Sequence, residues 1–291
     1  MEDKKIFNSK LYDTSIFLTA GFFGLTCIIY IFSFFINDKL DWEILLFLNP
    51  DSYIPVIEEL MVLVSDYSMF HFGLVFVAWE IAYQLSKKGD RARLKAQNAL
   101  MIVGAILSLI FVFGCFLNRY EHSIIFFPLS VMNLAGFWFI AKILVSYKEE
   151  NLKKINYIFW LTILSTLLAE LSAEWIIKNV VGRPRPLSDT YSAYNWGIRC
   201  VTDEVVIRGK SYVAGHSTVF FAIVTPMIYL TENRGFRTGL IVWALVHSFS
   251  RVYLAAHFPY CSLMGSILGF LMGTLVVIIF RDTTRQQTHT F

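Results

Sequence analysis

The sequence has little charge and little cysteine for its length. Only 16% of its 291 residues are charged, whereas 56% are hydrophobic, and its mean hydropathy is +0.57. A soluble domain of this size could not bury so much apolar surface, so the composition indicates a membrane protein. Four cysteines do not make a disulfide scaffold. The small net charge of +3 is spread among the loops and offers no basic surface to nucleic acid.

Internal repeats and low-complexity tracts are also missing, and a series of apolar runs fills the chain instead. Most runs are near the roughly 20 residues that a helix needs to cross a bilayer. We therefore expect an all-α fold, a polytopic transmembrane helix bundle of about eight spans. Residues 53–68 form an interfacial helix or lengthen the second span. The runs cover residues 16–36, 69–85, 98–117, 123–145, 155–177, 213–230, 239–251 and 260–280.

A cleavable secretory signal is not evident. The first run is too long for a typical signal core and no small-residue cleavage site follows it, so we expect it to act as an anchor. Lysine and arginine gather in every second connection, and basic connections stay in the cytoplasm. This pattern predicts an integral multi-pass protein with both termini cytoplasmic. Residues 178–212 then lie on the extracellular, periplasmic or lumenal face.

Three clusters of basic residues and histidine stand at the ends of apolar runs. They are Lys178 to Pro186 (KNVVGRPRP), Val213 to Ser217 (VAGHS) and Ser250 to His257 (SRVYLAAH), and all three are predicted on the non-cytoplasmic face. Taken singly, each is as well explained by ordinary boundary charges or a structural histidine. Together, permanent cations suit a bound phosphate. Glu170, Glu174 and Lys178 are spaced four residues apart on one helical face, which favours charge pairing that holds the lysine in place.

Two histidines supply what phosphate transfer needs. A neutral His257 can attack phosphorus, and a protonated His216 can donate to the leaving oxygen. Gly215 lets the backbone come close to an anion, and the start of the apolar run there presents free helix amides. The sequence therefore predicts a membrane-embedded phosphatase.

The clusters resemble the signature of the type-2 phosphatidic acid phosphatase superfamily, which also contains the glucose-6-phosphatases and the vanadium haloperoxidases. The resemblance covers roughly residues 170–280. A lysine, six residues and Arg-Pro are matched by Lys178 and Arg185-Pro186; Pro-Ser-Gly-His is matched by Gly215 and His216; and Ser-Arg, five residues and His are matched by Ser250, Arg251 and His257. The resemblance implies that His257 is the nucleophile, that His216 is the general acid, and that no metal or cofactor is required. It also makes Lys178, Arg185 and Arg251 the phosphate clamp, beside Gly215.

Two positions depart from that signature. Ala214 stands where a serine donates to phosphate, a hydrogen bond to a charged group that is worth about 1.5 to 3 kcal/mol. Ser217 and Thr218 are the candidates to replace it. Cys261 stands where an aspartate orients the nucleophilic histidine, although glucose-6-phosphatases also lack that aspartate. In catalytic triads, losing the orienting carboxylate lowers turnover by about 10⁴-fold.

The leading hypothesis is a hydrolase of lipid phosphates or diphosphates that works among membrane lipids through a phosphohistidine. The alternatives are a sugar phosphatase, since residues 250–259 are very similar to glucose-6-phosphatase, a transferase that passes the phosphoryl group to an alcohol, and a silent relative that binds a lipid phosphate or a partner protein. We expect residues 1–150 to hold N-terminal transmembrane helices without a motif and residues 151–291 to hold the phosphatase core. The sequence gives no oligomeric state.

Overall fold

The computed structural model of the chain describes residues 38–49, 54–117, 126–191, 197–199, 209–231 and 233–280. Within these ranges the regular structure is helical, and an isolated backbone bridge between Pro184 and Lys210 is the only strand-like pairing. The all-α fold is therefore confirmed. The chain forms two compact units, which are residues 1–51 with 161–282, and residues 52–160 with 283–291.

Several helices are long and apolar enough to cross a membrane. Among the described residues these are Asp90–Ile110, Phe127–Ser146, Glu149–Val181 and Pro259–Ile279, and two shorter apolar helices are Phe72–Ser86 and Gly215–Leu230. Large apolar side chains such as Leu109 and Trp175 are exposed on them, as expected of helices that face lipid. The predicted count of eight spans is not confirmed, and the first predicted span, residues 16–36, lies outside the described residues.

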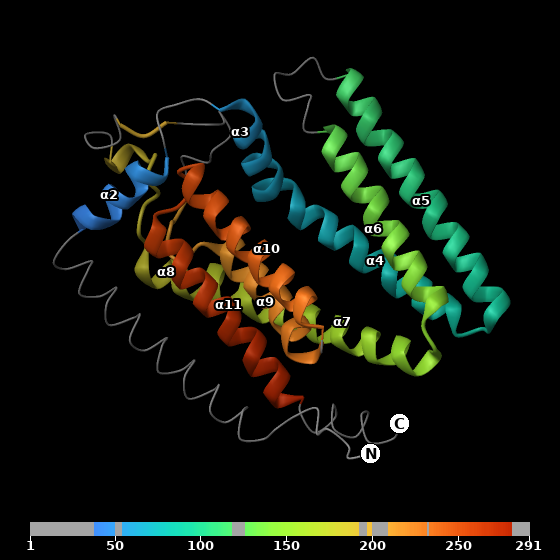
Figure 1. Ribbon diagram of the computed structural model, residues 1–291. Coiled ribbons are helices and arrows are strands. Elements are labelled where there is room, and N and C mark those ends of the chain that lie inside the picture. Colours follow the sequence, from blue (N-terminus) through green and yellow to red (C-terminus); the bar gives the residue numbers. More distant parts are fainter. Residues whose placement is uncertain are drawn as a thin grey trace. The chain divides into compact units, whose positions relative to one another are not determined.

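One unit contains α3 (Pro55–Val62), η1 (Leu63–Tyr67), α4 (Ser68–Ser86), α5 (Asp90–Leu117), α6 (Phe126–Ser146) and the first half of α7 (Glu149–Glu170). The first three follow one another without a break, so residues 55–67 extend the helix of the second predicted span toward the N-terminus. The long helices α5 and α6 lie side by side (Figure 1). Ser108 and Ser130 each donate to the other's backbone carbonyl at 3.0 Å, which joins the two helices.

The other unit carries all three basic and histidine clusters. It contains α2 (Asp38–Leu48), the second half of α7, the π-helical turn η3 (Leu171–Ile177), α8 (Lys178–Val181), η4 (Asp189–Tyr191), α9 (Gly215–Leu230), α10 (Arg234–Tyr253) and α11 (Pro259–Ile279). The helical run that begins with α7 ends at Gly182, whose φ of 65° is the left-handed conformation that glycine adopts without strain.

Helices α9 and α11 pack closely because α11 carries a row of glycines. Gly265, Gly269 and Gly273 are spaced four residues apart and therefore share one face of the helix. A Cβ atom on Gly269 would collide with the carbonyl oxygen of Thr218, and one on Gly265 would lie 2.5 Å from the carbonyl oxygen of Ala214. The glycines thus allow the backbones of the two helices to touch, as small residues do in membrane helix pairs.

The connection predicted over residues 37–52 contains a helix, α2, which packs beside the third cluster. The Trp42 ring meets the Phe258 ring edge-on, with centroids 4.9 Å apart. At the end of α2, the side-chain amide of Asn49 donates to the carbonyl of Tyr253 at 2.7 Å. These contacts attach α2 to the loop between α10 and α11, the loop that carries His257.

Candidate functional site

The three clusters meet at one end of the helices in the unit that contains α9, α10 and α11. Lys178 lies at the start of α8, Gly215 and His216 begin α9, and Arg251 lies in the last turn of α10. Lys178 Nζ is 3.5 Å from the point where a Cβ of Gly215 would be. The basic residues and histidines expected at the site from the resemblance therefore lie around one region of the fold.

Lys178 is held by its neighbour on the same helix. Its side chain is buried and pairs with the carboxylate of Glu174, which confirms the predicted ion pair. The Glu174 carboxylate lies against Gly215, where a Cβ atom would collide with it. A side chain at position 215 would therefore displace the Glu174 carboxylate that holds the lysine.

Arg185 offers donors that the described residues leave unused. It follows Pro184, whose fixed φ and whose backbone bridge to Lys210 set the course of the chain. Its Nε and Nη1 atoms are buried and have no hydrogen-bond partner among the described residues. Burial and then the nearby charge of Arg251 lower the pKa of Arg185. A buried guanidinium with unused N–H groups, lying near a second cation that repels it, is suited to bind an anion with several oxygens.

The first turn of α9 adds backbone donors. Its N-cap, Ala214, provides no side-chain cap, and the first hydrogen bond at this end joins the Thr218 amide to the Ala214 carbonyl at 3.0 Å. The amides before Thr218 are therefore not used by the helix, and such amides bind anions. His216 lies in this turn, with its ring parallel to that of His247 at a centroid distance of 6.2 Å.

The two hydroxyls expected to compensate for Ala214 are engaged inside the helix bundle. Ser217 is fully buried and its Oγ accepts a hydrogen bond from Ser248 Oγ at 3.1 Å. Thr218 donates to the Ala214 carbonyl at 3.0 Å. Thr218 therefore directs its hydroxyl hydrogen to the helix backbone rather than to the phosphate site, whereas Ser217 only accepts in its hydrogen bond.

His257 lies in a tight loop after α10. The carbonyl of Arg251 accepts from the amides of Ala256 and His257 at 3.0 and 3.2 Å, and Ala255 is left-handed with a φ of 53°. Both Arg251 and His257 are buried. Burial lowers the pKa of His257 well below its ordinary value, and the charges of Arg185, Arg251 and Lys178 lower it further. His257 is therefore neutral at physiological pH, the form in which an imidazole is a nucleophile.

A backbone carbonyl orients the His257 ring. The Nδ1 atom lies 2.8 Å from the carbonyl oxygen of Ser211. A carbonyl only accepts, so Nδ1 carries the hydrogen and Nε2 keeps a free lone pair. Cys261, which replaces the orienting aspartate, has a free thiol. The Cys261 Sγ accepts from Ser211 Oγ at 3.3 Å and from Arg183 Nη1 at 3.6 Å.

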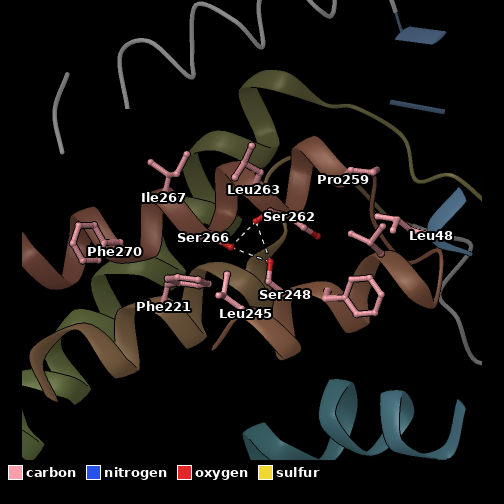
Figure 2. Close-up of a pocket in the computed structure, with 12 residues that line it drawn as sticks. Leu48, Phe221, Leu245, Ser248, Pro259, Ser262, Leu263, Ser266, Ile267 and Phe270 are labelled. Atoms are coloured by element: carbon pink, nitrogen blue, oxygen red, sulfur yellow. Dashed lines mark hydrogen bonds between the residues drawn. The ribbon is translucent and has the colours of Figure 1, made fainter. Parts of the chain in front are cut away.

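An apolar pocket with a volume of about 700 Å³ opens between α10 and α11, near the clusters. Leu245, Phe249, Leu263 and Phe270 are among the residues that line it, and hydroxyls of Ser248 and Ser266, 2.9 Å apart, lie at its floor. Figure 2 shows these serines beside Ser262. The buried Ser262 Oγ also lines the pocket and has no hydrogen-bond partner among the described residues.

Sequence reasoning missed three residues of this site, which are Asp41, Arg183 and Ser211. Arg183 was visible only as an additional arginine in the first cluster, and Ser211 as one of several polar residues before the second. Nothing in the local sequence of Asp41 marks it, because its partner is 142 positions away.

Comparison with known proteins gives one family. The model of the family described as the PAP2 superfamily matches residues 154–285, the segment that holds all three clusters. The resemblance indicated by the clusters is therefore confirmed. No curated protein and no solved structure gives a significant match to the chain.

Proposed function

Because residues 154–285 match the PAP2 superfamily, whose members include phosphatases, we propose that the chain is a membrane-embedded hydrolase of lipid phosphates or diphosphates. The observation that carries the proposal is the meeting of two histidines with Lys178, Arg185 and Arg251 around one buried region. The cations form the phosphate clamp, together with the amides at the start of α9. The histidines perform the proton and phosphoryl transfers.

In the first step the Nε2 lone pair of His257 forms a bond to phosphorus while the bond from phosphorus to the leaving oxygen breaks. The negative charge of the bound phosphate offsets the surrounding cations, so His216 holds a proton in the complex and gives it to that oxygen, and the alcohol or phosphate leaves without an added negative charge. In the second step His216 takes a proton from water, the water oxygen attacks phosphorus, and the phosphorus–nitrogen bond breaks. Inorganic phosphate and neutral His257 are regenerated. Throughout, the clamp stabilises the charge on the phosphoryl oxygens.

The pocket between α10 and α11 favours a lipid over a sugar as the group that carries the phosphate. It begins beside the clusters, at Val252 and Pro259, and continues to Phe270. From Pro259 to Phe270 the helix rises by roughly 16 Å, a length suited to a hydrocarbon chain. The lining is apolar, which suits a tail that stays among the helices. The unused hydroxyl of Ser262 suits a polar group near the head of that tail.

The proposed site faces away from the cytoplasm. The basic connections around Lys88 and Arg234 support this orientation. A phosphate head group at the membrane boundary would then reach the clamp while its tail remained in the bilayer.

The test of the proposal is phosphate release by the purified protein. The panel is phosphatidate, a prenyl diphosphate, a sphingoid phosphate and glucose 6-phosphate, each run with the native protein and with His257→Ala. We expect release from one or more lipid phosphates and a loss of at least about 10³-fold in the variant, because the nucleophile is removed. Release that survives His257→Ala, or hydrolysis of glucose 6-phosphate alone, would contradict the proposal.

A pair of tryptophan variants tests the role of the pocket. Leu263→Trp fills the pocket, whereas Leu275→Trp places the same ring on α11 outside it. We expect the first variant to raise KM for long-chain lipid phosphates and to leave a short-chain phosphate unaffected. The second should change neither substrate. Equal effects of the two variants would mean that the tail does not lie in this pocket.

Two of the alternatives stay as outcomes of the same assays. Phosphorylated alcohol in place of free phosphate would indicate a transferase that uses the same histidines. Binding of a lipid phosphate without turnover would indicate a silent relative. The hydrogen bond from His257 Nδ1 to the Ser211 carbonyl argues against the silent relative, because it supplies the orientation that the missing aspartate would give.

A further inference from the structure

A buried carboxylate from outside the family-matched segment contacts Arg183 and the first turn of α11, three residues after His257. Asp41, on α2, accepts a hydrogen bond from Arg183 Nη1 at 2.6 Å through Oδ2. Its other oxygen, Oδ1, accepts from the backbone amide of Tyr260 at 3.1 Å. The side chains of Asp41 and Arg183 are only 4% and 1% exposed. A buried ion pair with this geometry is costly to break from one side, because the remaining charge is left without its partner.

Arg183 connects this carboxylate to the groups that touch His257. The Nη1 that binds Asp41 also lies 3.6 Å from Cys261 Sγ. The Arg183 backbone carbonyl accepts from the Ser211 amide at 2.6 Å, and the guanidinium stacks 3.8 Å from the centre of the Phe258 ring. Arg183 therefore fixes both Ser211, whose carbonyl orients His257, and Phe258, the residue that follows His257.

We propose that Asp41 and Arg183 are positioning residues for His257, and that the Asp41 carboxylate takes over the task of the aspartate that is absent at position 261. The connection runs from Asp41 through Arg183 to Ser211 and Cys261, and from Ser211 to His257 Nδ1. The inference rests on the proposed function, in which His257 is the nucleophile. It adds that α2, which the family match does not include, completes the site.

If the Asp41 carboxylate replaces the aspartate that is absent at position 261, the effects of substitutions at the two positions should depend on each other. A purely structural ion pair does not by itself predict such a dependence. Cys261 Sγ is 3.6 Å from Arg183 Nη1 and 3.3 Å from Ser211 Oγ. An aspartate at 261 could therefore bind the same groups. In the native chain it would be a second buried carboxylate beside one guanidinium that Asp41 already neutralises, and like charges in a buried site repel. Once Asp41 is neutral, the same substitution should help.

The experiment measures kcat and KM of Asp41→Asn, Cys261→Asp and the double variant with the best substrate of the panel. We expect Asp41→Asn to lower kcat by about 10- to 100-fold, the usual effect of losing a residue that orients a catalytic group, with KM unchanged. Cys261→Asp alone should also lower kcat. The double variant should recover most of the native kcat. An unchanged kcat in Asp41→Asn, or losses that simply multiply in the double variant, would overturn the proposal.

Asn49→Ala is the matched control, because it loosens α2 without touching Asp41. It removes the buried hydrogen bond from Asn49 to the Tyr253 carbonyl and the two hydrogen bonds between Asn49 and the backbone of Arg199. Its melting temperature should fall, its kcat should stay near the native value, and adding Cys261→Asp should not improve it. If Asn49→Ala reproduces the kcat loss of Asp41→Asn, α2 acts by docking alone and the positioning role is wrong.

The tautomer of His257 provides a readout that needs no turnover. In ¹⁵N-histidine-labelled protein, the His257 signals are identified by their loss in His257→Gln. The native ring should carry its hydrogen on Nδ1, and Asp41→Asn and Arg183→Lys should increase the Nε2–H form. A tautomer unchanged in both variants would refute the positioning role even in a protein that hydrolyses nothing, whereas a native protein without activity refutes only the proposed function.

Discussion

At the scale of single residues, Gly215 determines how closely the start of α9 approaches Lys178. A Cβ there would collide with the Glu174 carboxylate, so Gly215→Ala must displace the group that holds the lysine. We expect kcat/KM to fall by about 10-fold or more, equivalent to roughly 1.4 kcal/mol, mainly through a higher KM. Steady-state kinetics on the best substrate measures this effect.

The double variant shows whether Gly215 acts through this pair. Because Gly215→Ala and Glu174→Gln both disturb Lys178, their effects on kcat/KM should be less than additive. Gly239→Ala serves as the control, since a Cβ at position 239 meets nothing within 4 Å. Additive losses would mean that Gly215 contributes by some other route.

The buried, neutral His257 also makes stability depend on pH. In the unfolded chain a histidine takes up a proton near pH 6.5, whereas burial and nearby cations lower the pKa of His257 in the folded protein. The unfolded state therefore binds more protons as pH falls below about 6.5, and the folded state loses stability there, by up to about 1.4 kcal/mol at pH 5.5. Above pH 7 the contribution is fully present.

Comparison of the native protein with His257→Gln isolates this effect. The glutamine does not titrate, so the melting temperature of the variant should fall less between pH 7.5 and 5.5 than that of the native protein. Parallel curves would indicate that His257 is already protonated in the fold, or that it keeps its ordinary pKa there.

The sequence predicted those site contacts that depend on residues close together in the chain. It did not predict the contacts between residues that are far apart in the chain. Glu174 and Lys178 are one helical turn apart, and their pairing follows from spacing alone. The pairing of Asp41 with Arg183 and the hydrogen bond from His257 to Ser211 depend on how distant segments pack. A backbone carbonyl, moreover, leaves no trace in the residue type that carries it.

At the scale of helices, the contact between α9 and α11 depends on glycine. At Gly269 an added Cβ would collide with the Thr218 carbonyl oxygen, and neither backbone can move without disturbing the start of α9. We expect Gly269→Ala to lower the free energy of unfolding by about 1 to 3 kcal/mol, the usual cost of overpacking. Thermal unfolding in detergent measures this change.

Gly239→Ala, on the exposed part of α10, should not lower the stability of the protein, in contrast to Gly269→Ala. No neighbour opposes its Cβ, and alanine is the better helix former by roughly 0.5 to 1 kcal/mol. The melting temperature of this variant should stay the same or rise. A fall as large as that of Gly269→Ala would show that close packing is not the cause.

The helix positions themselves follow closely from hydropathy, whereas their ends do not. The predicted run 69–85 corresponds to α4 (Ser68–Ser86), and the predicted run 260–280 corresponds to α11 (Pro259–Ile279). The predicted run 239–251 begins five residues after the true start of α10 at Arg234. The helix begins earlier because the Asn233 side chain caps it within polar sequence that precedes the apolar run. The helix α2 was missed because α2 lies in a segment with too many acidic residues to read as a span.

At the scale of the whole molecule, the direction in which the chain crosses the membrane remains a prediction that labelling can decide. Lys88, Arg234 and Thr190 are exposed positions, the first two in basic connections and the third after the first cluster. In intact cells, cysteines placed at Lys88 and Arg234 should resist a membrane-impermeant thiol reagent, and one at Thr190 should react above the level of the native protein. The opposite pattern would place the site in the cytoplasm.

The ion pair between Asp41 and Arg183 also limits which segments can be exchanged between this protein and its relatives to make hybrid proteins. A hybrid that received residues 154–285 alone would inherit the cysteine at 261 without the carboxylate that accompanies it. Such a graft should work only when residues 38–49 travel with it, or when aspartate is restored at 261 in the same step. If Asp41 positions His257 as proposed, the segments that must be transferred together to preserve the site are not continuous in sequence. They include α2, which lies far from the three clusters in the chain.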